Sequence, residues 1–203
     1  MPVTNPPSTS RAERKEHTRR ALLDGTLALA AERGFGAVSL REVARSAGIV
    51  PTAFYRHFAS LDALGLMLVD EAILALRTTL RAIRRSPAAA DHRQYVNAVF
   101  DHVGARRELV GFLVRERHGG SGALHRAIED GLHRIAAEFA VDLSRFADQD
   151  PDTLDIVAEL MVSTMADRVA VFLDTAPADA PAVIARTERQ MRVILLGMRA
   201  WQA

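Results

Sequence analysis

The chain has 203 residues, 49% of them hydrophobic and 25% charged, with a formal net charge of +1. It contains no cysteine, which excludes disulfide bonds and thiolate metal sites, and no apolar run approaches the ~18 residues that a membrane-spanning helix needs. Residues 1–12 are rich in Pro, Ser and Thr and lack the basic and apolar segments of a secretory signal, so we expect a disordered arm and a cytoplasmic protein.

The small net charge hides an asymmetry along the chain. Residues 1–60 hold nine Lys and Arg against five Asp and Glu, a difference of +4, whereas residues 61–203 hold seventeen against twenty, a difference of −3. A basic end is the electrostatic footprint that a nucleic-acid-binding surface requires, although a solvated basic face also explains so modest an excess. Few aromatic residues and many Ala, Leu and Arg favour helices over strands, so we predict an all-α fold.

Apolar spacing and helix start and stop signals predict about nine helices. The first spans residues 13–32 and stops at Gly34. Two short helices follow within residues 39–58, and Ser60 is placed to cap a long helix at 61–84. Asp91 is placed to cap a helix that runs to about Val103, and further helices are predicted at 108–117, 123–146 and 151–174. Pro177 and Pro181 precede the last helix, which is predicted to run to Trp201.

Residues 39–58 are the most informative stretch of the chain. Ser39 and Glu42 have the Ser-x-x-Glu spacing of a capping box, so a helix should begin at Leu40. Gly48 tolerates the positive φ that ends such a helix and begins a tight turn. Two short helices around a tight turn form a helix-turn-helix, whose second helix enters the major groove of DNA.

The second helix of this motif is predicted at 51–57. Pro51 suits its first turn, because the missing N–H of proline needs no intrahelical partner there. Phe54 and Phe58 are four residues apart and should pack inward. The side chains left for the outer surface are Thr52, Ala53, Tyr55, Arg56 and His57. We expect the first two to meet base edges and the two aromatic rings to hold phosphates.

An ordinary helical hairpin would show the same capping box and turn. An exposed Tyr-Arg-His run directly after the turn is unusual for a solvated face, so the pattern favours DNA binding. The start of the first helix is also crowded with basic residues, among them Lys15 and Arg19, and we expect it to lie near the sugar-phosphate backbone.

Residues 15–64 resemble the DNA-binding domain of TetR-type (tetracycline-repressor-like) transcriptional regulators. The matching segments are Ala-Glu-Arg-Gly-Phe at 31–35, Ser-Leu-Arg-Glu-Val-Ala at 39–44, Ala-Gly-Ile at 47–49 and Phe-Tyr-Arg-His-Phe at 54–58. The resemblance implies a homodimer with a DNA-binding domain at 13–60 and a ligand-sensing and dimerisation domain at 61–203. The predicted DNA contacts are Lys15, Arg19, Ser39, Leu40, Arg41, Thr52, Ala53, Tyr55, Arg56 and His57.

Two positions depart from the usual pattern of this family. Val50 stands where the family often has a Ser or Thr cap, and Leu61 stands where it often has a Lys that touches phosphate. The recognition helix should therefore lack a side-chain cap, and one phosphate contact should be missing.

The last two predicted helices are rich in apolar residues. These are Leu154, Val157, Leu160, Met161, Met165, Val169 and Phe172 in the first, and Val183, Ile184, Met191, Ile194, Leu195 and Met198 in the second. Such faces can simply fill the core of one chain, but in TetR-like proteins the corresponding pair forms a four-helix interface between two copies. Because a palindromic operator needs two recognition helices, we expect a homodimer through these helices.

The helices between residues 61 and 174 should enclose a pocket for a small hydrophobic effector. Its expected lining is Met67, Tyr95, Val99, Phe100, Val103, Phe112, Met161, Met165 and Phe172, although such residues also serve as plain core. Arg115, Glu116 and Arg117 come just before a glycine-rich break. The two arginines can place anion-binding charge at the pocket mouth, or the three residues can form only local ion pairs at a helix end.

Three segments resemble one subgroup of the TetR-type regulators in particular. Residues 49–58, 61–71 and 112–117 are similar to those of TetR-type repressors of unsaturated fatty-acid synthesis that sense long-chain acyl-CoA, a subgroup that shares Val50 and Leu61. The likeness fades after about residue 130. It implies that acyl-CoA shifts the long helix and the spacing of the two recognition helices, and so changes operator affinity in a direction that the sequence leaves open.

Other functions predict different behaviour. A TetR-type sensor of a drug or small metabolite, controlling an efflux or catabolic gene, would share the whole N-terminal pattern. A non-specific DNA-coating protein would prefer no operator, and the modest basic excess argues against it. An enzyme or metal site would need clustered reactive groups, but the seven histidines are scattered and no glycine-rich phosphate loop or serine elbow is present, so we expect no catalysis, metal or cofactor.

Overall fold

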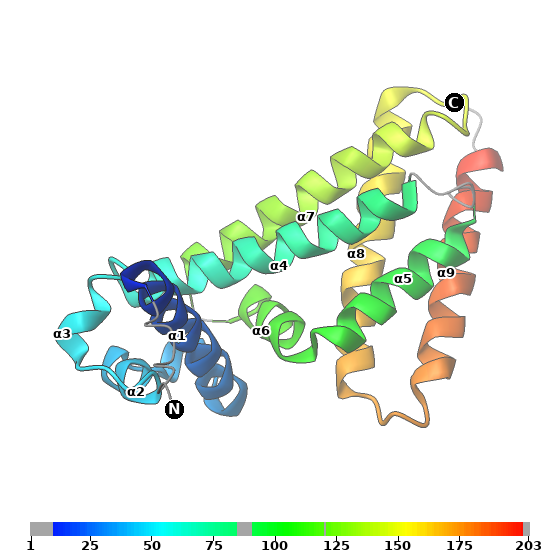
Figure 1. Cartoon of the computed structure of the whole chain (residues 1–203). Coiled ribbons are helices and arrows are strands. Elements are labelled where there is room, and N and C mark those ends of the chain that lie inside the picture. The colour runs from blue at the N-terminus through cyan, green and yellow to red at the C-terminus, as the bar shows by residue number, and fades with distance from the viewer. Residues whose placement is uncertain (1–9, 85–90, 120, 201–203) are drawn as a thin grey trace, which may run out of the picture.

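The computed structural model describes residues 10–84, 91–119 and 121–200, and this part of the chain is helical throughout (Figure 1). Its elements are α1 (Arg11–Arg33), the 3-10 helix η1 (Phe35–Ala37), α2 (Leu40–Ser46), α3 (Pro51–Phe54), α4 (Leu61–Arg84), α5 (His92–Ala105), α6 (Arg107–Arg117), α7 (Gly122–Leu143), α8 (Pro151–Asp174) and α9 (Ala180–Ala200). The predicted all-α fold is confirmed, with nine α-helices in the described residues.

The helices form two packed groups that α4 joins. α1, η1, α2 and α3 gather at one end, and α4 and α7 run side by side away from them (Figure 1). At the other end α8 packs against α7 and α9, and α9 packs against α5. One hydrophobic cluster combines α1–α3 with parts of α4, α6 and α7, and a second fills the space among α4–α9. Because α4 contributes to both clusters, a displacement of this helix affects both ends of the molecule.

Several helix ends follow the capping signals in the sequence. Ser39 and Glu42 form the predicted capping box, in which the N–H of Ser39 donates to the carboxylate of Glu42 at 3.0 Å. Gly48 has a φ of 69°, as its place after α2 requires. The N–H of Ala63 donates to the hydroxyl of Ser60 at 3.0 Å, so Ser60 caps α4 as predicted.

The start of α1 corrects the prediction. The helix begins at Arg11 instead of residue 13, because Ser10 and Glu13 form a second capping box. Arg11 and Ala12 therefore belong to α1 and not to the predicted arm, whose residues 1–9 lie outside the described residues.

Two other helices end earlier than predicted. α3 ends at Phe54, and residues 55–57 form a turn in which the N–H of His57 donates to the carbonyl of Phe54 at 2.8 Å. α7 ends at Leu143 instead of residue 146. The predicted end of the last helix at Trp201 lies outside the described residues, and α9 is described as far as Ala200.

The 3-10 helix η1, which the sequence analysis did not predict, connects the two packed groups through Phe35. The Phe35 ring lies edge-on to Phe112 of α6, with ring centroids 5.7 Å apart. It also fills the space beside Gly65 of α4, where an added Cβ would lie 2.7 Å from Phe35 Cζ and 3.1 Å from Leu124 of α7. The backbone N–H of Phe35 donates to Oε1 of the buried Glu116 at 3.1 Å. These four neighbours form what we call the Phe35 socket, which fixes α1–α3 on α4, α6 and α7.

Candidate nucleic-acid interface and ligand pocket

The outer face of the α3 region is exposed and polar. Phe54 and Phe58 are buried as predicted, so the side chains between them point away from the core. Thr52, Tyr55 and Arg56 are exposed, and Ala53 and His57 are half-buried. The Tyr55 ring is 63% exposed and rests edge-on against the Phe54 ring, with centroids 5.8 Å apart. Packing on the buried Phe54 ring therefore orients the Tyr55 phenol toward solvent.

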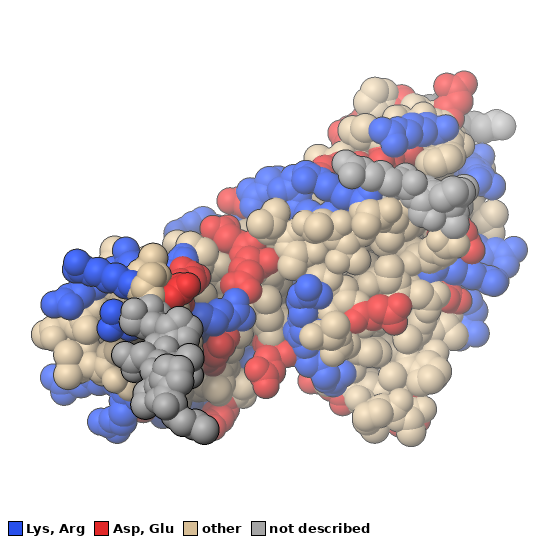
Figure 2. Space-filling model, viewed as in Figure 1, with Lys and Arg blue, Asp and Glu red and all other residues tan. Residues whose placement is uncertain are grey.

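Four of the predicted DNA contacts come together from α1 and from the turn that follows α3. His57 lies near Lys15 and Arg19 of α1 and near Arg56, at the end of the molecule where Lys and Arg side chains gather (Figure 2). Burial, and then the positive charges of these three residues, hold the pKa of His57 below its ordinary value. The Nδ1 atom of His57 is buried and has no hydrogen-bond partner among the described residues. An anion beside this cluster would relieve the repulsion among its cations.

The start of α2 holds the remaining predicted DNA contacts. Ser39 is exposed, but its hydroxyl donates to Oε2 of Glu42 at 2.6 Å and serves as a helix cap. This bond, together with an ion pair of 2.6 Å to Arg33 of α1, lowers the pKa of Glu42 to about 2. Leu40 is half-buried, and Arg41 is exposed. Arg41 reaches solvent and forms no ion pair with the residues that the structure describes.

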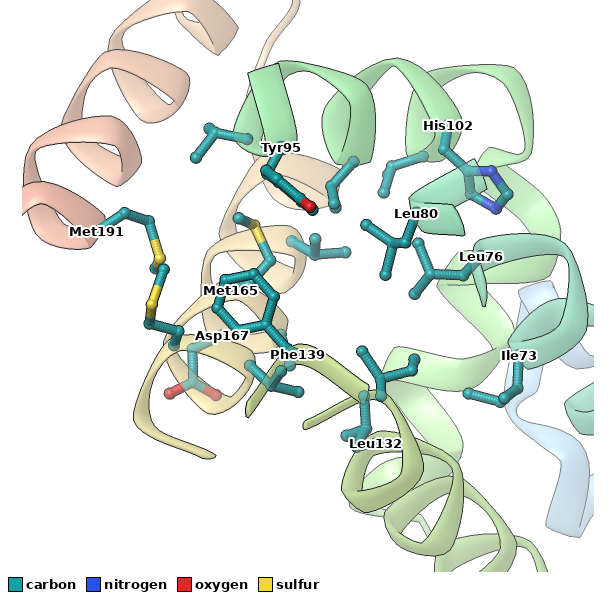
Figure 3. Close-up of a pocket in the computed structure, with 18 of the residues that line it drawn as sticks. Ile73, Leu76, Leu80, Tyr95, His102, Leu132, Phe139, Met165, Asp167 and Met191 are labelled. Carbon is teal, nitrogen blue, oxygen red and sulfur yellow. The ribbon is translucent and has the colours of Figure 1, made fainter. Parts of the chain in front are cut away.

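A cavity of about 240 Å³ lies among α4–α9, and most of its lining is apolar (Figure 3). The predicted residues that line it are Tyr95, Val99, Val103, Arg117, Met161 and Met165. The side chains of Tyr95 and Met165 extend into the cavity from α5 and α8 (Figure 3).

Five predicted lining residues lie elsewhere, which corrects the prediction for Met67, Phe100, Phe112, Arg115 and Phe172. Met67 packs in the hydrophobic cluster of α1–α3, and Phe112 belongs to the Phe35 socket. Phe100 and Phe172 pack on each other in the core, with ring centroids 4.9 Å apart. Arg115 is exposed to solvent.

The sequence analysis missed much of the cavity wall. Residues of α4, α7 and α9 that line it include Ile73, Leu76, Leu80, Leu132, Phe139 and Met191. The spacing of three, four and seven residues among those of α4 is a signal that could have found one continuous helix face. Met191 and Met198, grouped by sequence with the dimer face, are buried within the single chain.

Three consecutive residues at the end of α6 lie in three different environments. Arg115 is exposed, Glu116 is only 3% exposed in the Phe35 socket, and Arg117 lines the cavity. The Nε of Arg117 donates to Glu129 of α7 at 2.7 Å, and its Nη1 lies 3.6 Å from Asp167 of α8. Arg117 thus lines the cavity and is also a member of an ion-pair group that joins three helices, while its role in binding an anionic ligand stays a prediction.

Within the described ranges, no helix is long and apolar enough to cross a membrane. The same residues contain no group of three or more His, Asp and Glu side chains placed to hold a metal ion.

Comparison with known proteins shows a similarity in the N-terminal sequence and in the overall fold. Residues 22–66 match the family model described as "Bacterial regulatory proteins, tetR family". A putative TetR-family transcriptional regulator from Syntrophomonas wolfei superposes with a TM-score of 0.77 at 11% identity, covering 92% of this chain and 99% of its own. A transcriptional regulator from Rhodococcus sp. Rha1 (TM-score 0.68, 20% identity) and the fatty acid degradation regulator FadR from Bacillus halodurans (TM-score 0.71, 14% identity) each cover 90% of this chain and 96% of their own. At these identities the likeness establishes the fold alone.

Proposed function

We propose that this chain is a TetR-family transcriptional regulator that binds a palindromic DNA operator as a homodimer and changes its operator affinity when an apolar effector fills the cavity. The observation that supports this most directly is the path of α4. The helix begins at the end of the helix-turn-helix, and its Ile73, Leu76 and Leu80 line the cavity. An effector that repositions α4 therefore changes the placement of the recognition helix, and so the populations of operator-competent and incompetent states.

On the DNA side, the exposed face of the motif divides into two roles. Thr52 and Ala53 would meet base edges in the major groove, where short side chains allow close approach. The cationic cluster of Lys15, Arg19, Arg56 and His57 would hold phosphates, with Tyr55, Ser39, Leu40 and Arg41 around it. A phosphate near the cluster would also reduce the electrostatic repulsion that, after burial, lowers the pKa of His57.

Replacing Tyr55 with Phe should weaken binding to every DNA sequence about two- to tenfold, because it removes one hydrogen bond to phosphate and leaves the ring packing on Phe54 intact. The measurement is fluorescence anisotropy on an operator duplex and on a scrambled duplex of the same length. Tyr95→Phe, which alters the other tyrosine of the chain, should leave both affinities unchanged. A changed ratio between the two duplexes would assign Tyr55 to base recognition instead.

The effector we propose is a long-chain acyl-CoA. The cavity offers an aliphatic wall for an acyl chain, and each buried CH₂ contributes roughly 0.8 kcal/mol, so chain length and shape can be discriminated. Arg117 lines the same cavity and is the cation suited to an anionic group of the ligand. Its 2.7 Å bond to Glu129 is closer than its 3.6 Å approach to Asp167, so an incoming anion would compete first with Asp167.

The deciding experiment titrates the purified protein with saturated and unsaturated long-chain acyl-CoA while it is bound to a fluorescent duplex from upstream of its own gene. Binding that resists competitor DNA and shifts with acyl-CoA would support the whole proposal and reveal whether the effector releases or strengthens binding. Tight operator binding whose affinity does not change with acyl-CoA would support the role as a DNA-binding regulator and would exclude acyl-CoA as the effector.

Arg117→Ala should weaken the acyl-CoA response about tenfold while leaving operator binding by the effector-free protein unchanged. Asp167→Asn should strengthen the response about two- to threefold, since it removes the competing carboxylate from a half-exposed ion pair. Arg115→Ala is the matched control, because this arginine of the same helix faces solvent away from the cavity. An unchanged acyl-CoA affinity in the first variant would remove Arg117 from the effector site.

A second candidate effector is a lipophilic cation, as in a drug-responsive regulator of an efflux gene. The observation that favours it is that two carboxylates, Asp142 and Asp167, are among the cavity residues, together with the aromatic rings of Tyr95 and Phe139. Carboxylates and aromatic faces both attract organic cations. Tetraphenylphosphonium in the same titration tests this alternative, and a response to it without a response to acyl-CoA would select the drug sensor.

A further inference from the structure

His102 is a buried polar side chain in the cavity wall. It lies on α5 and is 6% exposed (Figure 3). Val99 and Val103 of the same helix also line the cavity. Its Nδ1 atom lies 2.9 Å from the hydroxyl of Thr79 on α4 and 3.5 Å from Nη1 of Arg106 at the end of its own helix. The imidazole thus spans the two helices, and the Thr79 hydroxyl fixes its orientation.

The surroundings of His102 determine its charge and its tautomer. Burial, and then the positive charge of Arg106, hold the pKa of His102 below its ordinary value, so the ring is neutral near pH 7. The Thr79 hydroxyl lies 3.2 Å from the carbonyl of Ala75 and 2.9 Å from Nδ1 of His102. Because the shorter contact is to Nδ1, and because the guanidinium of Arg106 beside Nδ1 can only donate, we infer that Nδ1 is unprotonated and accepts from the hydroxyl. The ring proton is then on Nε2, and Nε2–H is the donor that remains for a ligand.

Two charged residues of the cavity, unlike His102, lie near side chains of opposite charge. Arg117 is paired with Glu129 and lies near Asp167, which is mostly exposed. Asp142 lies 3.5 Å from Arg145. His102 instead offers a neutral donor beside valines, where an uncharged ligand atom meets the smallest desolvation cost.

We propose that Nε2–H of His102 donates to an uncharged oxygen of the effector, such as that of a hydroxyl, keto, ester or thioester group, and that this position discriminates against a free carboxylate. The inference rests on the proposed function, since it concerns the same cavity. Burying an ionised carboxylate beside valines costs far more than one neutral N–H donor returns, whereas a neutral oxygen gains the bond at little cost. Through Thr79, the same contact also ties the ligand to α4.

The test compares four ligands with the same twelve-carbon chain: 1-dodecanol, methyl laurate, laurate and dodecyltrimethylammonium. It uses the Arg117→Ala protein, so that this cavity arginine does not hold the carboxylate of laurate. Displacement of Nile red from the full-length protein measures their binding at pH 7.5. We expect 1-dodecanol and methyl laurate to bind at least about tenfold more tightly than laurate. Laurate binding as tight as that of 1-dodecanol, or failure of both neutral ligands to displace the dye, would overturn the inference.

Variants assign the effect to His102. His102→Phe should lower the affinity for both neutral ligands about tenfold and leave Nile red affinity unchanged, because it removes the donor and keeps an apolar ring. His102→Gln, which retains a side-chain N–H, should restore part of the loss. Val99→Ala, on the same helix, should weaken all four ligands alike. Unchanged selectivity in His102→Phe contradicts the assignment.

Anisotropy on the operator duplex separates this inference from the proposed function. If neutral ligands bind through His102 but leave operator affinity unchanged, the proposed regulatory role of the cavity is wrong and the proposed His102 hydrogen bond is supported. A shift in operator affinity with all four ligands alike would keep the regulatory role and reject the His102 contact.

Discussion

Replacing Leu160 with Asp should leave the protein monomeric and weaken operator binding by about 100-fold or more. Leu160 is 52% exposed in the single chain although it lies near the middle of α8, and Ile156 of the same helix and Val193 and Leu196 of α9 are also exposed. Two linked recognition helices gain their affinity from effective concentration, which commonly contributes a factor of 10² or more and is lost when the link is broken.

A shallow hollow connects α8 and α9. It is lined by Thr164 of α8, one turn beyond Leu160, and by Arg186, Arg189, Gln190, Val193 and Ile194 of α9. The side-chain oxygen of Gln190 is buried there and accepts no hydrogen bond from the described residues. A second copy of the chain on this face would cover the apolar side chains and can supply the missing donor, whereas an Asp at position 160 would have to be buried there as an unpaired charge.

Val141→Asp is the matched control for this prediction. Val141 is as exposed as the residues of the proposed dimer face but lies on α7, so the same change of charge there should leave a dimer. Size-exclusion chromatography with light scattering measures the mass of both variants, and operator anisotropy measures the affinity. A dimeric Leu160→Asp protein would move the proposed interface away from α8 and α9.

The second large effect concerns the Phe35 socket. Gly65→Ala should lower the free energy of unfolding by about 1–3 kcal/mol and weaken operator binding by about tenfold or more. The added Cβ would lie 2.7 Å from the Phe35 ring and 3.1 Å from Leu124, so α1–α3 must shift on α4 to make room. Because half-site spacing is a geometric requirement, a shifted helix-turn-helix fits the operator less well even when the protein is folded.

Gly131→Ala gives the comparison that separates stability from geometry. Its added Cβ would lie 2.8 Å from the side chain of Ile73, a similar clash, but at the α4–α7 contact beside the cavity. We expect a similar loss of stability in chemical denaturation, weaker effector binding and unchanged operator affinity without effector. Equal operator affinity in the two alanine variants would show that the socket does not position the DNA-binding helices.

The local features of this fold were predictable from sequence because they depend on neighbouring residues. The capping box of Ser39 and Glu42, the positive φ of Gly48 and the start of α8 at Pro151 all follow from short-range hydrogen bonding and backbone sterics. The inward packing of Phe54 and Phe58 followed from their spacing alone.

The cavity was harder to predict because α6 has important neighbours on more than one side. Phe112 and Arg117 are on the same short helix, yet the first packs under η1 and the second lines the cavity. Apolar spacing identifies which residues are buried, but it does not say which neighbouring helix buries them. The link between Phe35 and Glu116 joins residues 81 positions apart, and no local signal in the sequence indicates such a pair.

The Phe35 socket also limits how freely the two ends of this chain can be exchanged with those of its relatives. Leu64 and Leu68 of α4, Phe112 of α6 and Leu124 of α7 share one hydrophobic cluster with α1, α2 and α3. A chimera joined at residue 60 would separate Phe35 from the pocket built to receive it. A working chimera of the N-terminal helices with another C-terminal domain therefore also needs the matching contact surface of α4, α6 and α7. In such a protein, the residues that must be exchanged together are those of the helix contact, even though they are far apart along the chain.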